Sequence, residues 1–240
     1  MFENNLAESR TEAKNFIISE NVFVNGKTIT KPAYDVDEND VVSVNVESKR
    51  YVSRGGLKLE AAIEYFKVSP NNKLAIDVGA SSGGFTDCLL KNGAEAVVAV
   101  DSGSGQMVRS LREDSRVIVI ENYNARYMKS EDFPFVPNFA VMDVSFISAT
   151  LILPALSSCL APSSDFICLV KPQFEVGRSG LGKGGIVKND KLRKQAVDKV
   201  VLFAKTVGFD CVGVMESPIT GGDGNIEFLV HFKKEMLTYE

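Results

Sequence analysis

The segment that most constrains the fold comprises residues 74–87, an apolar run that ends in a glycine-rich turn and continues as a helical pattern. The turn contains Gly79, Gly83 and Gly84, and glycine allows a backbone to come close to a ligand. Asp101 ends the next apolar run, about 20 residues farther along, which is the usual spacing of an acid that binds a ribose. Because backbone amides and a helix N-terminus would face the ligand, the segment predicts a site for a nucleoside cofactor.

The glycine spacing narrows the choice of cofactor. The turn lacks the G-x-G-x-x-G pattern of dinucleotide-binding proteins and fits S-adenosylmethionine better. An ordinary tight connection between a strand and a helix is the alternative interpretation. We expect the turn to line the methionine end, Asp101 to accept hydrogen bonds from the ribose and Asn124 to lie near the adenine. The predicted cofactor-binding residues are Asp77, Gly79, Ser81, Gly83, Gly84, Phe85, Asp101, Asn124 and Asp143.

Beyond the glycine turn, apolar runs alternate with helical patterns. Strands are predicted at residues 74–79, 96–101, 117–122, 139–145, 165–171, 209–217 and 225–233, and a long helix at 190–207. This alternation predicts an α/β domain whose parallel sheet is covered on both faces. No helix separates the last two strands, so they should form a hairpin that leaves the final strand antiparallel. A seven-stranded, mostly parallel sheet with one reversed strand resembles the Rossmann-like class I methyltransferase fold.

The first 47 residues read as a separate small α+β unit. A helical stretch carries Arg10 and Lys14 on one face, and Lys27 follows a strand and an Asn25-Gly26 hairpin turn. Dispersed cations such as these are also typical of a solvated surface.

Three segments of this unit, at residues 7–14, 22–27 and 35–40, resemble the S4-like RNA-binding module, with a first helix that the chain enters part-way. The resemblance implies an RNA-binding domain at 1–47. A basic linker is predicted at 48–56 and the methyltransferase domain at 57–240, beginning with an amphipathic helix at 57–66.

The composition excludes several classes of protein. No apolar run reaches the roughly 18 residues that a membrane span requires, and the polar N-terminus does not resemble a signal peptide. The four cysteines are far apart in the 240-residue chain, and His231 is the only histidine, so we expect neither disulfides nor a metal site and predict a reducing cytoplasm. Because the formal net charge is −4, any site for a polyanion must be a local basic patch.

Four charged residues are expected at the edge of the sheet where the parallel strands end. They are Lys58, Asp143, Lys171 and Glu227, and three of them interrupt apolar strand patterns. A buried charge costs roughly several kcal/mol unless it is paired, so a structural ion pair between Asp143 and Lys171 is one interpretation. Proton transfer is the other, because a desolvated lysine close to a second lysine has its pKa lowered toward neutrality and can accept a proton from a hydroxyl.

Five segments read together resemble the TlyA (haemolysin A) family of FtsJ-like RNA methyltransferases. They are residues 51–59, 77–88, 142–148, 170–175 and 224–227. The resemblance implies 2′-O-methylation of cytidine in ribosomal RNA, in the large subunit more firmly than in the small one. It also implies that Lys171 accepts the proton, that Asp143 orients Lys171, and that Lys58 and Glu227 tune charge and position.

A glycine-rich segment at residues 177–183 matches most of a phosphate-binding P-loop, but Gly184 stands where a Ser or Thr is required. We interpret it as a mobile loop beside the active site, with Arg178 and Lys183 available to RNA phosphates. The predicted RNA-binding residues are Arg10, Lys14, Lys27, Arg50, Arg54, Arg178 and Lys183.

Two other functions remain alternatives at this stage. The family name suggests a membrane-lytic haemolysin, although the sequence has no strongly basic amphipathic helix. An RNA-binding protein with an inactive methyltransferase domain is disfavoured because all four catalytic positions are filled. The expected partner is therefore ribosomal RNA or a ribosomal subunit, and the expected cofactor is S-adenosylmethionine.

Overall fold

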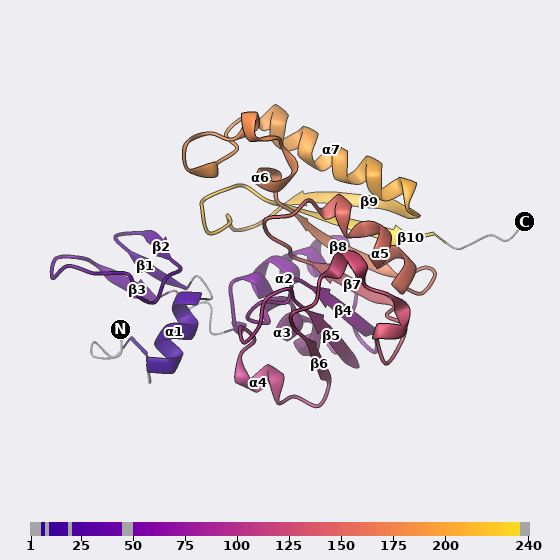
Figure 1. The fold of residues 1–240 in the computed structure, drawn as a ribbon, viewed down its shortest axis with the longest axis horizontal. Helices are drawn as coiled ribbons and strands as arrows, with labels where there is room; N and C mark the ends of the chain where they lie inside the picture. The colour runs from indigo at the N-terminus through magenta and orange to yellow at the C-terminus, as the bar shows by residue number, and fades with distance from the viewer. Residues whose placement is uncertain (1–5, 8–9, 19–20, 45–49, 236–240) are drawn as a thin grey trace, which may run out of the picture.

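The computed structural model describes residues 6–7, 10–18, 21–44 and 50–235, and its largest part is an α/β domain built on one sheet (Figure 1). The strands of this sheet are β4 (Leu74–Val78), β5 (Ala96–Val100), β6 (Val117–Ile120), β7 (Phe139–Met142), β8 (Asp165–Val170), β9 (Phe209–Glu216) and β10 (Phe228–Lys234). Their spatial order is β6-β5-β4-β7-β8-β10-β9. Strands β4 to β8 are parallel and β10 is antiparallel to both neighbours. The predicted seven-stranded sheet with a reversed final strand is confirmed.

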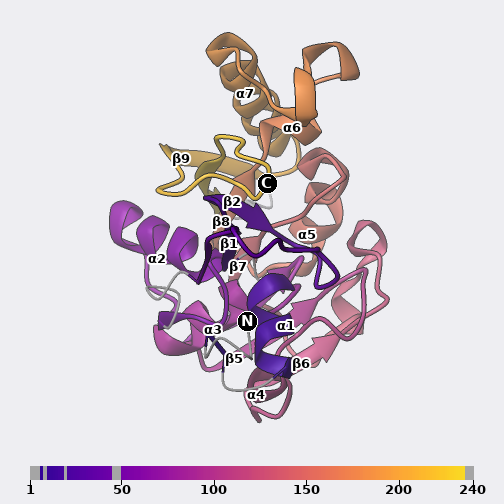
Figure 2. The ribbon, with the colours of Figure 1, turned by 90° about the vertical axis from the view of Figure 1, so that its left-hand side faces the viewer.

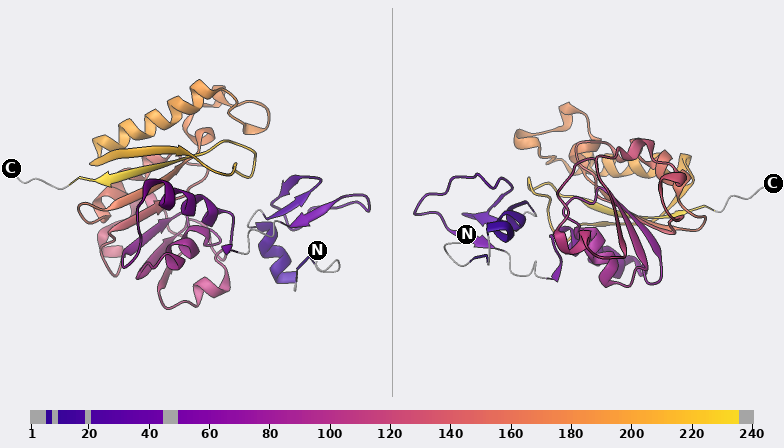
Figure 3. Two further views of the ribbon diagram at one scale, coloured as in Figure 1. Left: turned by 180° about the vertical axis from the view of Figure 1, so that it is seen from behind. Right: turned by 60° about the horizontal axis from the view of Figure 1, so that its bottom comes forward.

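Helices cover both faces of the sheet because successive strand residues point to opposite sides. Ala75 and Val97 pack with α2 (Gly55–Phe66) and α3 (Gly84–Lys91), whereas Ile76 and Val98 share a core with α5 (Leu153–Cys159) and α7 (Asp190–Thr206). In the left view of Figure 3, the purple α2 lies in front of the sheet. The continuous apolar strands of the sequence therefore reflect burial on two sides.

Short helices fill the connections. They are α4 (Arg109–Arg112), α6 (Pro172–Glu175) and the 3₁₀ turns η2 (Ala125–Tyr127), η3 (Ser130–Asp132), η4 (Ala149–Leu151), η5 (Arg178–Gly180) and η6 (Lys183–Gly185). None of the helices within the described ranges is long and apolar enough to cross a membrane.

The N-terminal unit contains α1 (Arg10–Ile18) and a three-stranded antiparallel sheet of β1 (Val22–Val24), β2 (Lys27–Ile29) and β3 (Val42–Val44) in the order β2-β1-β3. The predicted hairpin turn is present, because Asn25 and Gly26 both have positive φ angles, of 51° and 78°. Figure 2 shows β2 beside the loop that precedes β10. The unit therefore lies against one end of the α/β domain.

Several strands end earlier than the sequence predicted. β7 stops at Met142 and β8 at Val170, so Asp143 and Lys171 lie just beyond the strands that they were expected to interrupt. At this edge the chain leaves the hydrogen-bonded ladder, and polar side chains reach a pocket. Register pairs Phe228 with Val170, and this pairing brings Glu227, immediately before β10, to the same edge.

The boundary between the two units also differs in detail from the prediction. Helix α2 begins at Gly55, inside the linker predicted at residues 48–56 and two residues before the expected start. The first two residues of that linker, 48 and 49, lie outside the described part of the chain. The helix ends at Phe66, where Lys67 adopts a left-handed conformation with φ of 55°.

Candidate active site

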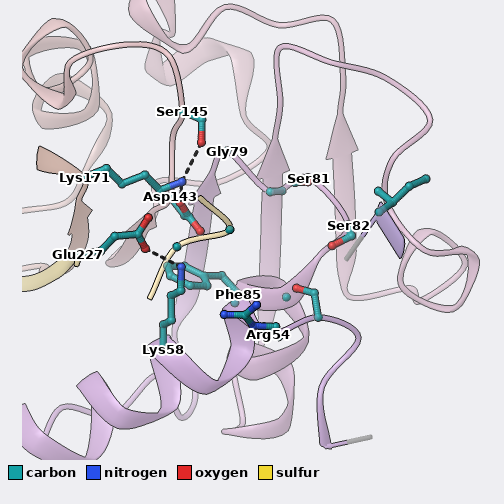
Figure 4. Close-up of a pocket in the computed structure, with 17 residues that line it drawn as sticks. Arg54, Lys58, Gly79, Ser81, Ser82, Phe85, Asp143, Ser145, Lys171 and Glu227 are labelled. Carbon is teal, nitrogen blue, oxygen red and sulfur yellow. Dashed lines mark hydrogen bonds and ion pairs between the residues drawn. The ribbon is translucent and has the colours of Figure 1, made fainter. Parts of the chain in front are cut away.

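Four charged side chains meet where the parallel strands end (Figure 4). Lys58 on α2 donates from Nζ to Oε2 of Glu227 at 2.6 Å, and Nζ of Lys171 lies 2.7 Å from Oδ1 of Asp143. Lys171 also donates to Oγ of Ser145 at 2.8 Å. The residues predicted from the sequence are therefore together, and each lysine has its own carboxylate.

The two ion pairs differ in their access to solvent. The side chain of Glu227 is 2% exposed and that of Lys58 10%, whereas Asp143 is 21% exposed. Burial opposes ionisation of Asp143, but the ammonium groups of Lys171 and Lys58 outweigh burial and hold the pKa of this carboxyl below its ordinary value. Asp143 is therefore an anion at neutral pH, and it is close enough to both lysines to interact with each.

Two pockets meet at the Asp143–Lys171 pair. The first contains all four charged side chains and is closed below by Phe85 of α3. The second extends over the ends of β4 and β5 toward Asn124. The residues that line both pockets are Gly79, Ser81, Asp143 and Ser145. A ligand in the second pocket would therefore approach the charged residues of the first pocket at these four residues.

The second pocket contains the residues predicted to hold the nucleoside. Asp101 follows β5, and its carboxylate accepts hydrogen bonds from the backbone N–H groups of Ser81 and Gly103 at 2.8 and 2.7 Å. Asn124 caps η2 by accepting from the N–H of Arg126 at 3.1 Å. Val100, Ile147 and Ile152 add apolar walls. An adenine ring fits such walls, and a carboxylate at the end of β5 suits a ribose, so the residues present fit S-adenosylmethionine.

Two glycines of the turn are also required by packing within the protein. A Cβ on Gly83 would lie 2.3 Å from Cδ1 of Leu111, and a Cβ on Gly84 would lie 2.1 Å from Oγ of Ser53. Gly83 has a φ of 97° and lines neither of the two pockets. Glycine is required at position 83 because the protein itself packs closely against the turn, and the contact of Gly83 with the cofactor stays a prediction.

The side chain of Asp77 lies beneath the turn and lines neither of the two pockets. Its side chain is fully buried, and Oδ2 accepts a hydrogen bond from Oγ1 of Thr86 at 2.7 Å. Oδ1 is buried without a hydrogen-bond partner in the described structure. Burial, which is the largest cause, raises the pKa of Asp77 to about 7. Asp77 therefore contacts the helix that follows the turn and leaves the ligand surface to its neighbours.

An exposed aromatic residue that the sequence analysis did not single out stands at the mouth of the site. Phe146 follows Ser145, has a φ of 64° and is 92% exposed. Its ring lies 5.2 Å from that of Phe174, just after Lys171 in the chain. A non-glycine residue in the left-handed region is uncommon, and no pattern in the sequence predicts this backbone angle at Phe146. Phe146 offers a flat apolar surface next to the ion pair.

The two segments that carry Asp143 and Lys171 are joined by Glu175. Its carboxylate accepts from Oγ of Ser148 at 2.6 Å, from the N–H of Ala149 at 2.7 Å and from Nζ of Lys199 on α7 at 2.9 Å. Its side chain is 2% exposed. Glu175 therefore connects the loop after β7, helix α6 and helix α7.

The cations predicted to bind RNA are dispersed over the molecule. Lys14, Lys27, Arg178 and Lys183 are exposed, and the side chain of Arg10 lies outside the described residues. Arg50 is paired with Glu60 at 2.7 Å. Arg54 donates to the carbonyl oxygen of Thr220 at 2.9 Å and lines the first pocket. Among the members of this group whose side chains are described, only Arg54 lines the pocket of the four charged residues.

The family is decided by two matches. Residues 51–234 match the family described as FtsJ-like methyltransferase, and residues 1–42 match the S4 domain. The chain belongs to the FtsJ-like methyltransferase family.

Relatives of this FtsJ-like chain carry two kinds of name. It is 48% identical to a candidate rRNA methyltransferase of Bacillus subtilis, over 96% of this chain and 83% of the other. It is 41% identical to the 16S/23S rRNA (cytidine-2′-O)-methyltransferase TlyA of Mycobacterium tuberculosis, over 96% of this chain and 86% of the other. A solved structure of a candidate hemolysin from Streptococcus thermophilus has a TM-score of 0.79 and 45% identity, and covers 98% of this chain and 86% of its own. The predicted resemblance to this family is confirmed.

The FtsJ-like match covers the glycine turn, the four charged residues and every residue that lines the two pockets except Ile18. Within the described residues, no group of three or more His, Cys, Asp or Glu side chains is arranged to hold a metal ion. His231 has a structural contact: its Nε2 lies 2.9 Å from Oδ1 of Asp165 on the neighbouring strand β8.

Proposed function

We propose that this protein transfers the methyl group of S-adenosylmethionine to the 2′-hydroxyl of a cytidine in ribosomal RNA. The observation that carries the proposal is the junction of the two pockets, where Asp143 and Lys171 lie between a nucleoside-shaped cleft and a second, charged pocket. The FtsJ-like match and the names of the relatives support the substrate class. Large-subunit rRNA is the first substrate to test and small-subunit rRNA the second.

In this proposal the bound cofactor supplies an activated methyl group on a sulfonium, which is already a good leaving group. The protein therefore has to align the hydroxyl and remove its proton. Lys171 is placed to do so, because its Nζ is held by Asp143 and Ser145 and faces the pocket. The amine must be unprotonated when the hydroxyl arrives. The proton then moves from the 2′-oxygen to Nζ, and Asp143 stabilises the ammonium that forms.

Lys58 and Glu227 have a supporting role in the proposed mechanism. Their pair is more deeply buried than the other, so its geometry is fixed by packing between α2 and the start of β10. Lys58 adds positive charge near Asp143. This charge keeps Asp143 ionised and leaves Lys171 as the group that exchanges a proton with the substrate.

Phe146 is the residue that we assign to the target base. An exposed ring beside the reacting groups can stack on a base that has left its helix, and such stacking contributes about 1–3 kcal/mol in single-stranded RNA recognition. The neighbouring ring of Phe174 supports Phe146 from the α6 side.

The division of labour follows the two matched regions. We propose that residues 1–47 bind RNA, that 48–56 link the units and that 57–240 carry catalysis, with Lys14 and Lys27 meeting phosphates. A protein that modifies ribosomal RNA would work in the cytoplasm.

The decisive experiment maps modified nucleosides. Unmethylated large and small ribosomal subunits are incubated with the protein and S-adenosylmethionine, and the RNA is digested and analysed by mass spectrometry. We expect 2′-O-methylcytidine that depends on Lys171. Methylation of a base instead of a ribose would contradict the proposed chemistry, and binding of rRNA without any methylation would favour an inactive RNA-binding protein.

A further inference from the structure

A groove lies between the N-terminal unit and the catalytic domain. One wall consists of β1, β2 and the chain that follows them, and the other consists of residues 184–186 and the loop at 220–224. Figure 2 shows the two walls side by side, with β2 next to the loop before β10. We call this surface the interdomain groove. It shares Arg54, Gly221 and Gly222 with the pocket of the four charged residues, so it adjoins the catalytic pocket directly.

The side chains of the interdomain groove suit a nucleic acid strand. Lys27 and Lys31 are exposed on the wall formed by the N-terminal unit, and Tyr34 on the same wall is 45% exposed. Asp223 is the acidic residue among those that line the groove. Cations that follow a backbone, combined with an aromatic ring on which a base can stack, are the usual features of single-strand binding.

Arg54 determines how the two walls meet. Its guanidinium lies 5.9 Å from the centre of the Phe23 ring in β1, and its Nη2 donates to the carbonyl oxygen of Thr220 in the opposite wall at 2.9 Å. One side chain therefore contacts both walls at the point where the groove joins the catalytic pocket. This contact fixes the relative position of the walls and places positive charge at the entrance.

The covalent continuity of RNA explains why a groove is needed at this place. A nucleotide whose ribose reaches Lys171 remains bonded to a neighbour on each side, so the strand has to leave the catalytic pocket through an opening that accepts phosphates. We propose that the interdomain groove binds the single-stranded nucleotides on one side of the methylated nucleotide, with phosphates at Lys27 and Lys31 and a base against Tyr34. This inference rests on the proposed function and adds to it the route of the strand.

A cross-linking experiment tests the route. The photoreactive amino acid p-benzoylphenylalanine is placed at Tyr34 in the full chain, which is then irradiated with the ribosomal subunit that it methylates. The matched control carries the same group at Tyr65, an aromatic residue on α2 that is 62% exposed and does not line the groove. We expect the Tyr34 position to cross-link to nucleotides adjacent to the methylated one, and the Tyr65 position not to do so.

The outcomes separate this inference from the proposed function. Cross-links from Tyr34 only to distant nucleotides or to ribosomal proteins, by a chain that still methylates, would overturn the groove and leave the methyltransferase intact. Failure of the unmodified chain to methylate any ribosomal RNA would contradict the proposed function, and the groove with it.

Charge reversal gives an independent measurement. The double variant Lys27→Glu with Lys31→Glu should weaken binding of a single-stranded RNA of roughly ten nucleotides, and should lower the slope of log affinity against log salt by about 2, one for each lost phosphate contact. Affinity for S-adenosylmethionine should not change, because its cleft lies elsewhere. The control is Lys205→Glu in the last turn of α7. Equal affinities and slopes in both variants would contradict the proposal.

Discussion

The ammonium group of Lys58 lies 2.6 Å from the carboxylate of Glu227, and both side chains are almost completely buried where α2 meets the start of β10. The two residues are 169 positions apart in the chain. Removing one partner leaves the other charge buried and unpaired, which typically costs about 3–5 kcal/mol.

The first prediction concerns the energetics of that pair. Lys58→Met and Glu227→Gln should each destabilise the protein, and the double variant should lose clearly less than the sum of the two single losses, because neither charge is then left alone. Urea unfolding of the three variants and the parent protein measures the coupling. Strictly additive losses would show that the pair is not a unit. Glu227→Gln should also reduce methyl transfer less than removal of Lys171 does.

The second prediction concerns Lys171. Lys171→Ala removes the proposed proton acceptor but leaves the cleft of Asp101 and Asn124 unchanged, so S-adenosylmethionine should bind with its normal affinity while methyl transfer falls by about two to four orders of magnitude. Calorimetry and single-turnover kinetics measure the two quantities. Lys205→Ala is the control for loss of a lysine outside the site. Near-normal turnover in Lys171→Ala would refute the assigned role.

The third prediction concerns pH and Asp77. Its ordinary pKa of 3.8 rises to about 7 because the carboxyl is buried, so between these values the folded protein holds a proton that the unfolded chain releases. Asp77 therefore makes folding progressively less favourable as pH rises from about 4 to about 7, by up to about 4 kcal/mol.

Asp77→Asn should remove this dependence. Its stability relative to the parent protein should increase from pH 5 to pH 8, because the amide cannot ionise. Thermal unfolding at several pH values measures the difference between the two proteins, and the comparison cancels the other titrating groups. A difference that stays constant across this range would mean that Asp77 is ionised in the folded protein throughout.

The fourth prediction concerns Glu175 as a positioning residue. Glu175→Ala leaves the N–H of Ala149 and the hydroxyl of Ser148 without their acceptor and should cost about 2–3 kcal/mol. If its contacts also hold Asp143 and Lys171 in place, kcat should fall while the affinity for S-adenosylmethionine stays within a few-fold. Glu175→Gln, which keeps an acceptor oxygen, should restore most of kcat. A variant that loses stability but keeps its full kcat would show that the role is structural alone.

The fifth prediction concerns the N-terminal unit. A chain that begins near residue 48 should retain the sheet and its covering helices, and should bind S-adenosylmethionine as the full chain does. It should lose most of its RNA affinity, and the salt dependence of the remaining binding should flatten as phosphate contacts disappear. Equal RNA affinity and equal salt dependence in the two chains would show that the unit is not an RNA-binding element.

The sequence predicted the sheet because burial on two faces produces uninterrupted apolar runs, and it predicted the four charged residues because charges next to such runs require partners. It did not predict that Lys58 pairs with Glu227. That pairing depends on the register of β10 against β8, which joins Phe228 to Val170 and which no local pattern encodes. The ion pair of Asp143 with Lys171, considered as an alternative to catalysis, is present and is compatible with it.

The glycine turn shows a different limit of prediction. The pattern predicted that Gly83 lines the cofactor site, and nothing in it indicated that Leu111 of α4 occupies the space beside this glycine. A Gly83→Val substitution would therefore disturb packing and a φ of 97° as well as any ligand. Likewise, Phe146 is exposed and has a positive φ because of the tertiary structure around it, so no local pattern distinguishes it from the neighbouring apolar residues.

The position of β10 has a consequence for the synthesis of the protein. This strand follows the other six strands of the sheet in the chain, yet it lies between β8 and β9 rather than at the margin of the sheet. A nascent chain that has emerged only as far as β9 contains both lysines and Asp143 but lacks Glu227, the carboxylate that pairs with Lys58. In the proposed mechanism, the reaction centre is therefore assembled only after β10 inserts between β8 and β9, and a product that stops before this strand would have the predicted cofactor cleft without Glu227.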